Sequence, residues 1–232
     1  MPDIFSNTND GKIDTGNVSG HSTARGASSG TATANENSSN SAIKYFRSSG
    51  RGATTVAIAR SFFFFNTSGV TGTVASATLD ISFSSNVFSG GFNIILAKSD
   101  AFGGDGGTAL SNDDFNNVDF STAYASAVGT GGSTTGTATF TLNATALADI
   151  KNNDAFIVAL LESDHDFSDS EPSDLSKTLA ITFAETGGNS SDPKLSYTLA
   201  TGYSHDIMAV AAASIGKVNT VATANISKVI GA

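Results

Sequence analysis

The segment Arg60-Ser61-Phe62-Phe63-Phe64-Phe65-Asn66 decides the fold, because it places four phenylalanines in succession. Successive side chains of a β-strand point to opposite faces, so Phe62 and Phe64 would enter one layer and Phe63 and Phe65 the other. A run that is apolar on both faces indicates a strand with protein packed on both sides of it. We therefore expect a central strand here, with the rest of the chain arranged around it.

Short segments with strand-like patterns surround this central strand. Residues 78–83 and 137–142 alternate polar and apolar side chains, as half-buried strands do, and residues 155–161 are apolar throughout. One short helix is expected at residues 143–150, with Thr145 as its N-cap. Many short strands, Gly-rich turns and almost no helix predict an all-β fold, a two-sheet β-sandwich of jelly-roll-like form.

The apolar positions of these strands give the expected core. They are Phe62, Phe63, Phe64, Phe65, Leu79, Ile81, Ile94, Leu96, Phe140, Phe156, Val158, Leu160, Ile181 and Phe183.

The chain divides into three parts by composition. Residues 1–41 are rich in Asn, Ser, Thr and Gly and are expected to form an extended N-terminal arm or loop-rich segment. Residues 42–203 contain the strand patterns and form the expected β-sandwich domain. Residues 204–232 form a C-terminal tail, in which the segment 214–219 returns as 225–230 with Ile, Lys and Val in matching places.

The repeated tail is expected to be an interaction segment. The offset between its two copies is 11 residues, which a helical stripe would allow, but β-branched residues, Asn and Gly favour short extended segments. Its apolar residues need a surface to cover them, since an isolated segment has little to bury them against. Self-association or docking on another protein would do so, and the alternative is packing on the tail's own domain. The residues concerned are Ile215, Val218, Ile226 and Val229.

The balance of charge and the residue usage exclude several classes of function. With 12 basic against 21 acidic residues the net charge is −9, whereas nucleic-acid binding needs clustered Lys and Arg. The absence of Cys excludes disulfides and Cys-ligated metals. No apolar stretch reaches the roughly 18 residues of a membrane span, and the N-terminus lacks the pattern of a secretory signal.

Acidic residues gather at two places that are candidates for a metal site. Glu162, Asp164 and Asp166 follow a buried strand, and closely spaced oxygen ligands are those that Ca²⁺ uses. They lack the Asp-x-Asp-x-Asp-Gly order, so the alternative is a solvated acidic loop that keeps a strand edge from pairing. No other cofactor is expected. The same two alternatives hold in the Gly-rich loop 99–117 for Asp100, Asp105, Asp113 and Asp114.

No arrangement of nucleophile, acid and base stands out in the sequence. His21, His165 and His205 are far apart, and a zinc site needs three or four ligands. Ser is abundant, but no Gly-x-Ser-x-Gly elbow occurs in a strand-turn-helix context. The run 103–107 is rich in Gly but lacks the following Lys-Ser/Thr of a phosphate loop. We therefore expect a protein that is not an enzyme.

Several elements together resemble the DNRLRE-type β-sandwich found in extracellular and viral structural proteins. They are the segment 60–65 with its Gly-bearing turn, Ala77-Thr78-Leu79, the turn 152–154 before Phe156 and the closing segment 192–197. The resemblance covers about residues 42–200 and is a pattern at the level of the fold.

The chain also resembles a family of tailed-phage and environmental-virus proteins. The opening 3–11, the segments 102–110 and 162–167, and the tail segment 217–222 carry this likeness. It implies a non-enzymatic structural protein on the exposed surface of a virion, most simply a tail-fibre, spike or adhesin-type component. Its expected partners are other virion proteins, further copies of itself, and a host-surface glycan or protein. The alternatives are a capsid decoration or head-fibre protein, and a carbohydrate-binding module or glycan-degrading enzyme.

Overall fold

The structure, a computed structural model, describes residues 2–34, 38–86, 93–131, 135–184, 189–200, 217–218 and 221–222. In this part of the chain fourteen strands join into one antiparallel network, and two short strands form a separate hairpin. The expectation of an all-β, sandwich-like fold is confirmed. Within the same ranges no helix has the length and apolar character needed to cross a membrane.

The strands of the large network are short at both chain ends and long in the middle. They are β1 (Asp3–Phe5), β2 (Gly11–Asp14), β3 (Val18–Ser19), β4 (Thr31–Ala34), β5 (Ser38–Gly50), β6 (Ala53–Asn66), β7 (Val74–Asn86), β8 (Asn93–Ser99), β9 (Val118–Ala123), β10 (Val128–Gly129), β11 (Gly136–Thr141), β12 (Ala155–Glu162), β13 (Leu175–Thr182) and β14 (Lys194–Leu199). The separate hairpin consists of β15 (Lys217–Val218) and β16 (Val221–Ala222). The helical elements are α1 (His21–Arg25), α2 (Ala144–Asn152) and the single turns η1 (Phe102–Gly104), η2 (Asn112–Asn116) and η3 (Ser163–Phe167).

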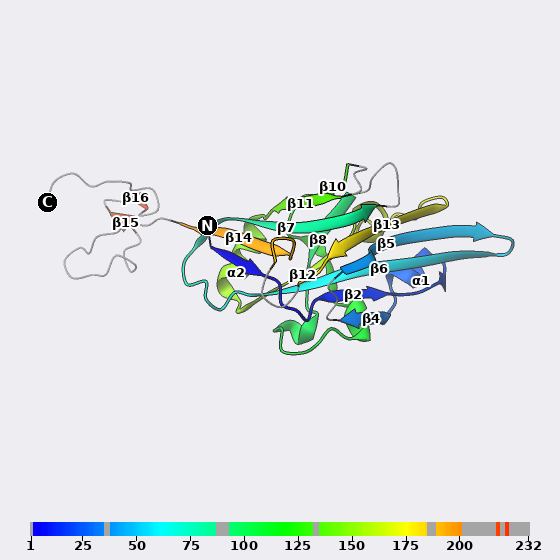
Figure 1. Cartoon of the computed structure of the whole chain (residues 1–232), viewed down its shortest axis with the longest axis horizontal. Helices are drawn as coiled ribbons and strands as arrows, with labels where there is room; N and C mark the ends of the chain where they lie inside the picture. The colour runs from blue at the N-terminus through cyan, green and yellow to red at the C-terminus, as the bar shows by residue number, and fades with distance from the viewer. Residues whose placement is uncertain are drawn as a thin grey trace.

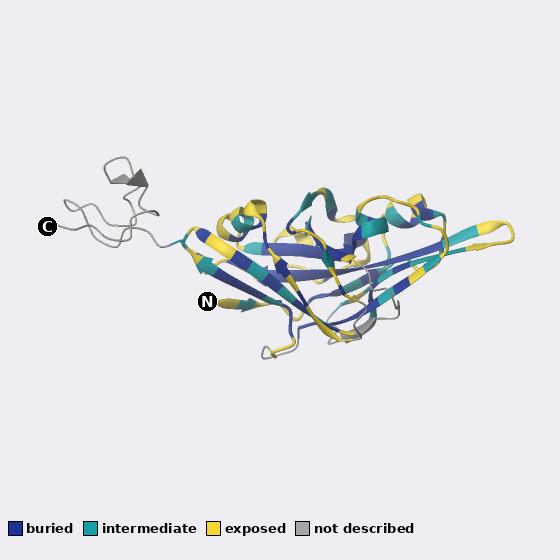
Figure 2. Cartoon of the chain, turned by 90° about the horizontal axis from the view of Figure 1, so that it is seen from above, coloured by how far each residue is buried: buried dark blue, intermediate teal, exposed yellow. Residues whose placement is uncertain are grey.

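Strand β6 carries the four phenylalanines and is the centre of the fold (Figure 1). Its N-terminal half pairs with β5, and its C-terminal half pairs with β12. The N-terminal strands β2 and β3 also pair with it. The β5–β6 hairpin runs beyond the other strands at one end of the molecule, and its tip, residues 49–53, is exposed (Figure 2).

The alternation of side chains along β6 divides the interior into two cores, as the sequence pattern predicts. Phe63 and Phe65 belong to a first core together with apolar residues of β7, β11, β13 and β14. Phe62 and Phe64 belong to a second core on the opposite face. Every residue expected in the core is buried, and the most exposed of them is Phe64 at 8%.

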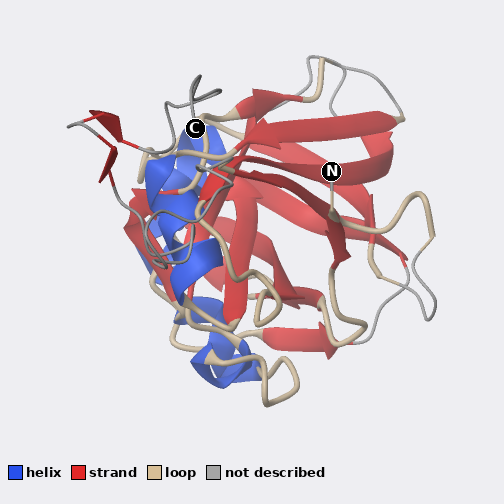
Figure 3. Cartoon of the chain, turned by 90° about the vertical axis from the view of Figure 1, so that its left-hand side faces the viewer, coloured by secondary structure: helices blue, strands red, loops and turns tan. Residues whose placement is uncertain are grey.

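Different elements cover the two cores. The first lies between the layer of β6, β8 and β12 and the layer of β7, β11 and β14, with α2 adding Ala146 and Ile150. The second is covered by β2, by α1 and by the loop that contains η1 and η2, which buries Phe102 and Phe115. Figure 3 shows the helical turns gathered along one side of the strands.

The N-terminal segment 1–41, expected to be an arm or a loop-rich segment, contributes elements of the sheet instead. Strand β1 pairs with β14, β2 pairs with β6, and Ile13 is fully buried. The sequence gives a weak signal here because Ile13 is the one large apolar side chain of β2. Pairing with the distant β6 stabilises what local preference alone would not.

The helix expected at residues 143–150 is α2, which begins at Ala144 and ends at Asn152. Its N-cap is Asn143 and not Thr145. The side-chain oxygen of Asn143 accepts a hydrogen bond from the backbone N–H of Ala146 at 3.1 Å. Asn is at least as good an N-cap as Thr, so the helix starts at the earlier of the two polar residues.

Candidate functional site

A buried ion pair joins β6 to the acidic loop that follows β12. Arg60, Phe62 and Phe64 occupy alternate positions of β6 and therefore lie on the same face of the strand. The side chain of Arg60 thus enters the second core. There its Nε donates to Asp166 Oδ2 at 2.8 Å and its Nη2 to Asp166 Oδ1 at 2.7 Å. Both side chains are fully buried. The pair is therefore bidentate, the geometry in which an Arg–carboxylate contact is strongest.

Two further N–H groups of Arg60 are bound as well. Nη1 donates to the carbonyl oxygen of Phe115 at 2.8 Å, and Nη2 donates to that of Arg25 at 2.9 Å. The guanidinium also lies 4.0 Å from the ring centroid of Phe115. The cation is enclosed and bound by the protein itself, so its role is to hold three segments together.

Helix α1 fastens the same loop from the other side. Arg25 Nε donates to the carbonyl oxygen of Asp166 at 2.6 Å. The two ring nitrogens of His21 make hydrogen bonds to the Tyr45 hydroxyl at 2.6 Å and to Asp169 at 3.1 Å. Burial raises the pKa of Tyr45 above its ordinary value, and nearby carboxylates, first that of Glu171, raise it further. Tyr45 thus stays a neutral hydroxyl in this polar layer.

The calcium candidates Glu162, Asp164 and Asp166 all bind groups of the chain itself. Glu162 accepts from the backbone N–H of His165 at 2.7 Å and lies 3.3 Å from the Lys177 ammonium. Asp164 accepts from Asn93 Nδ2 at 3.0 Å. Across the residues that the structure describes, no three Asp, Glu or His side chains are grouped as metal ligands. The arrangement gives the calcium hypothesis no support.

The acidic residues of the loop 99–117 separate into different roles. Asp114 is buried and accepts from Ser111 and Asn117, which closes the turn η2. Asp113 is exposed. Asp100 and Asp105 line a cavity of about 470 Å³ at the surface.

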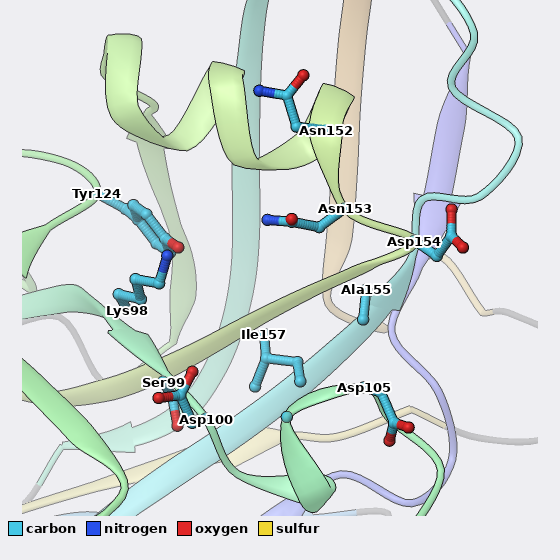
Figure 4. A pocket seen from close by; sticks show the side chains of 11 residues that line it. Lys98, Ser99, Asp100, Asp105, Tyr124, Asn152, Asn153, Asp154, Ala155 and Ile157 are labelled. Carbon is cyan, nitrogen blue, oxygen red and sulfur yellow. The ribbon is translucent and has the colours of Figure 1, made fainter.

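Three stretches that are distant in sequence, residues 98–105, Tyr124 and residues 152–157, form this polar cavity (Figure 4). Lys98 and Tyr124 stand at one side of the view and Asp105 and Asp154 at the other, with Asn153 between them. The cavity is lined by Lys98, Ser99 and Asp100 at the end of β8, by Gly104 and Asp105 around η1, by Asn152 to Ala155 in the turn from α2 to β12, and by Tyr124 and Ile157.

One side of the polar cavity is locked by hydrogen bonds. Asp149 of α2 accepts from the Tyr124 hydroxyl at 2.6 Å and from the Lys98 ammonium at 2.9 Å. Burial raises the pKa of Tyr124 above its ordinary value, and its hydrogen bond to Asp149 raises it further. By contrast, Asp100 and Asp154 make no side-chain hydrogen bond or ion pair to any residue that the structure describes. These carboxylates are available to a ligand.

The structure brings some of the candidates together and leaves others apart. His21 and His165, isolated in sequence, both lie against the Tyr45 ring, with centroid separations of 5.9 and 5.3 Å. Val218 lies in β15, which supports an extended tail at that point. His205, Ile215, Ile226 and Val229 lie outside the described residues.

Sequence reasoning missed the role of Arg60 and the existence of the polar cavity. The alternation of side chains along the strand did indicate a role for Arg60. It places this cation between Ile58 and Phe62 on the same buried face, where it requires a buried carboxylate partner. The cavity had no comparable signal, since its three segments meet only in the folded chain.

The chain matches no protein-family model and no curated protein.

Proposed function

We propose that the chain is a non-enzymatic structural protein of a virus particle, a tail-fibre, spike or adhesin-type component that acts in assembly and host-surface contact. One observation carries the structural role. The charged groups that converge inside the second core, Arg60 and Asp166, are fully buried and bound to each other. A buried pair whose charged groups bind each other holds segments in place and is closed to a substrate.

The packing of β6 suits such a role. A strand with a core on each face cannot bend without opening one of them, because protein interiors are close-packed. The result is a stiff module that carries loops and chain ends on its surface. Surface loops on a rigid scaffold are the usual place for contacts with other molecules.

The assignment to a particle rests on the sequence resemblance to tailed-phage proteins. In this reading the chain lies on the exposed surface of the virion, where other virion proteins and copies of itself are its partners. The capsid decoration or head-fibre role remains the alternative within the same class. The location of the chain in the particle separates the two.

The decisive experiment is to label purified particles with an antibody against the recombinant chain and image them by electron microscopy. Label at the tail supports the tail-fibre or spike role, and label spread over the capsid supports the decoration role. Particles that lack the chain, both in images and by mass spectrometry, would overturn the proposal as a whole.

The proposed self-association is tested on the full chain in solution by light scattering. The expected mass is a multiple of the 23.4 kDa of one chain. A variant in which Ile215, Val218, Ile226 and Val229 are all replaced by Ser should be a monomer. A wild-type protein that is itself a monomer at micromolar concentration would contradict assembly through the tail.

A carbohydrate-binding module is the second candidate function, and the polar cavity favours it. The cavity combines carboxylate and amide side chains with the apolar side chain of Ile157. A glycan-degrading enzyme would also cleave the polysaccharide that it binds. A depolymerisation assay with the full chain distinguishes that activity from binding alone.

A further inference from the structure

We infer that the polar cavity between the end of β8, η1 and the α2–β12 turn binds a neutral saccharide. The inference names a site for the host-surface contact included in the proposed function, and in that sense it rests on that proposal. The binding itself can be tested on the isolated chain.

The hydrogen-bonding groups of the cavity match a sugar. Asp100 and Asp154 supply carboxylate acceptors that have no partner within the described residues, and Asn153 supplies an amide that both donates and accepts. Sugar hydroxyls both donate and accept hydrogen bonds. A hydroxyl that donates to an ionised carboxylate makes a stronger hydrogen bond than one that donates to a neutral acceptor. In Figure 4 the Asn153 side chain reaches between the two sides of the cavity.

The charge of the cavity selects against anionic ligands. The one cation of its lining, Lys98, is paired with Asp149 at 2.9 Å. The carboxylates of Asp100, Asp105 and Asp154 are therefore not offset, and an acidic sugar, a phosphate or a sulfate would meet repulsion. A neutral sugar avoids this cost and keeps the hydrogen bonds.

The size and the walls of the cavity also fit. Its volume of about 470 Å³ falls in the range of small-molecule sites, about 300–1,000 Å³. Ile157 and Ala155 place apolar atoms beside the polar groups, and the C–H face of a pyranose ring can cover them. The frame is rigid, because the Tyr124 hydroxyl and the Lys98 ammonium both bind Asp149 and so fix α2 against β8.

The test is saturation-transfer NMR on the full chain at millimolar concentrations of free sugars. The neutral probes are methyl α-D-glucopyranoside, methyl α-D-mannopyranoside, methyl β-D-galactopyranoside and N-acetyl-D-glucosamine, and the anionic probe is N-acetylneuraminic acid. We expect saturation transfer to at least one neutral probe and none to the anionic probe. In the double variant Asp100→Ala/Asn153→Ala the affinity for that probe should fall by about tenfold or more, since two hydrogen bonds are lost.

The matched control is Asp113→Ala, which removes an exposed carboxylate of the same loop outside the cavity. It should leave binding unchanged, and circular dichroism should show that all variants are folded. Two results would overturn the inference: no transfer to any neutral probe, or transfer that persists in the folded double variant. Neither result bears on where the chain lies in a particle, so failure here is distinguishable from failure of the proposed function.

Discussion

Arg60 and Asp166 form a bidentate ion pair with both side chains fully buried, although 106 positions separate them in the sequence. The pair ties the central strand β6 to the loop after β12. Taking two charges out of water is costly, and their mutual attraction offsets this cost only when geometry and hydrogen bonding are good. Here Asp166 accepts two hydrogen bonds from Arg60, and Arg60 also donates to two backbone carbonyls.

Replacing Asp166 by Ala should destabilise the protein by about 3–5 kcal/mol, because it leaves the Arg60 cation buried without a counter-charge. Urea unfolding followed by tyrosine fluorescence or circular dichroism measures this change. The matched control is Asp164→Ala, which removes a partly exposed carboxylate of the same loop and should cost about 0–1 kcal/mol. Equal losses from the two variants would contradict the structural role of the buried pair.

The double variant Arg60→Met/Asp166→Leu tests the pair from the opposite direction. It removes both charges and keeps apolar volume in the second core. We expect it to be more stable than Asp166→Ala alone, since no unpaired charge remains buried. If the double variant is the less stable of the two, the penalty arises from lost packing and not from the isolated charge.

Phe62 and Phe63 point to opposite faces of β6, and both are fully buried. Each truncation to Ala, made separately, should therefore cost about 3–5 kcal/mol of unfolding free energy. Chemical denaturation of the two variants provides the measurement. Phe5→Ala, at an exposed position, is the control and should change stability by about 0.5 kcal/mol or less. A strand with one solvated face would show the large loss for only one of the two central residues.

The sequence is informative about the centre of this fold because four phenylalanines in succession can be buried only by two layers. Alternation in β7 and β11 likewise predicts their inward residues, Leu79, Ile81 and Phe140, since period-two patterning directly reflects burial on one face. These predictions need only local information. They place the core without stating which strands are neighbours.

The remaining features depend on contacts between distant segments, which a single sequence does not encode locally. Strand β1 pairs with β14 across almost the whole chain, as Ile4 opposite Leu195 shows. The polar cavity assembles Asp100, Tyr124 and Asn153 from three separate segments. Such pairings are decided by tertiary packing, which overrides the weak local preferences of Ser-, Thr- and Gly-rich stretches.

Stability is expected to fall in alkali because of Tyr45 and Tyr124. Burial raises the pKa of both above the ordinary tyrosine value of about 10. The unfolded chain releases these protons above about pH 10 while the folded chain keeps them, so the stabilising contribution is complete below that pH and is lost as pH rises further. Urea unfolding across this range measures the effect, and the variant Tyr45→Phe/Tyr124→Phe should show a shallower alkaline decline. An identical decline in both proteins would assign it to other groups.

Gly106 lies against the ring of Phe64, and its backbone has a φ of +77°. A Cβ at this position would stand 2.6 Å from both Cε atoms of Phe64, which is too close for the ring to keep its place in the second core. The variant Gly106→Ala should therefore lose about 1–2 kcal/mol from the left-handed backbone and about 1–3 kcal/mol more from overpacking. Gly104→Ala is the matched control, because Gly104 has a φ of +80° but open space around its added Cβ, so that it carries the backbone cost alone. Thermal and urea unfolding of the two variants give the difference. Equal destabilisation would mean that Phe64 moves aside without cost, and that the loop around η1 is not packed tightly on the second core.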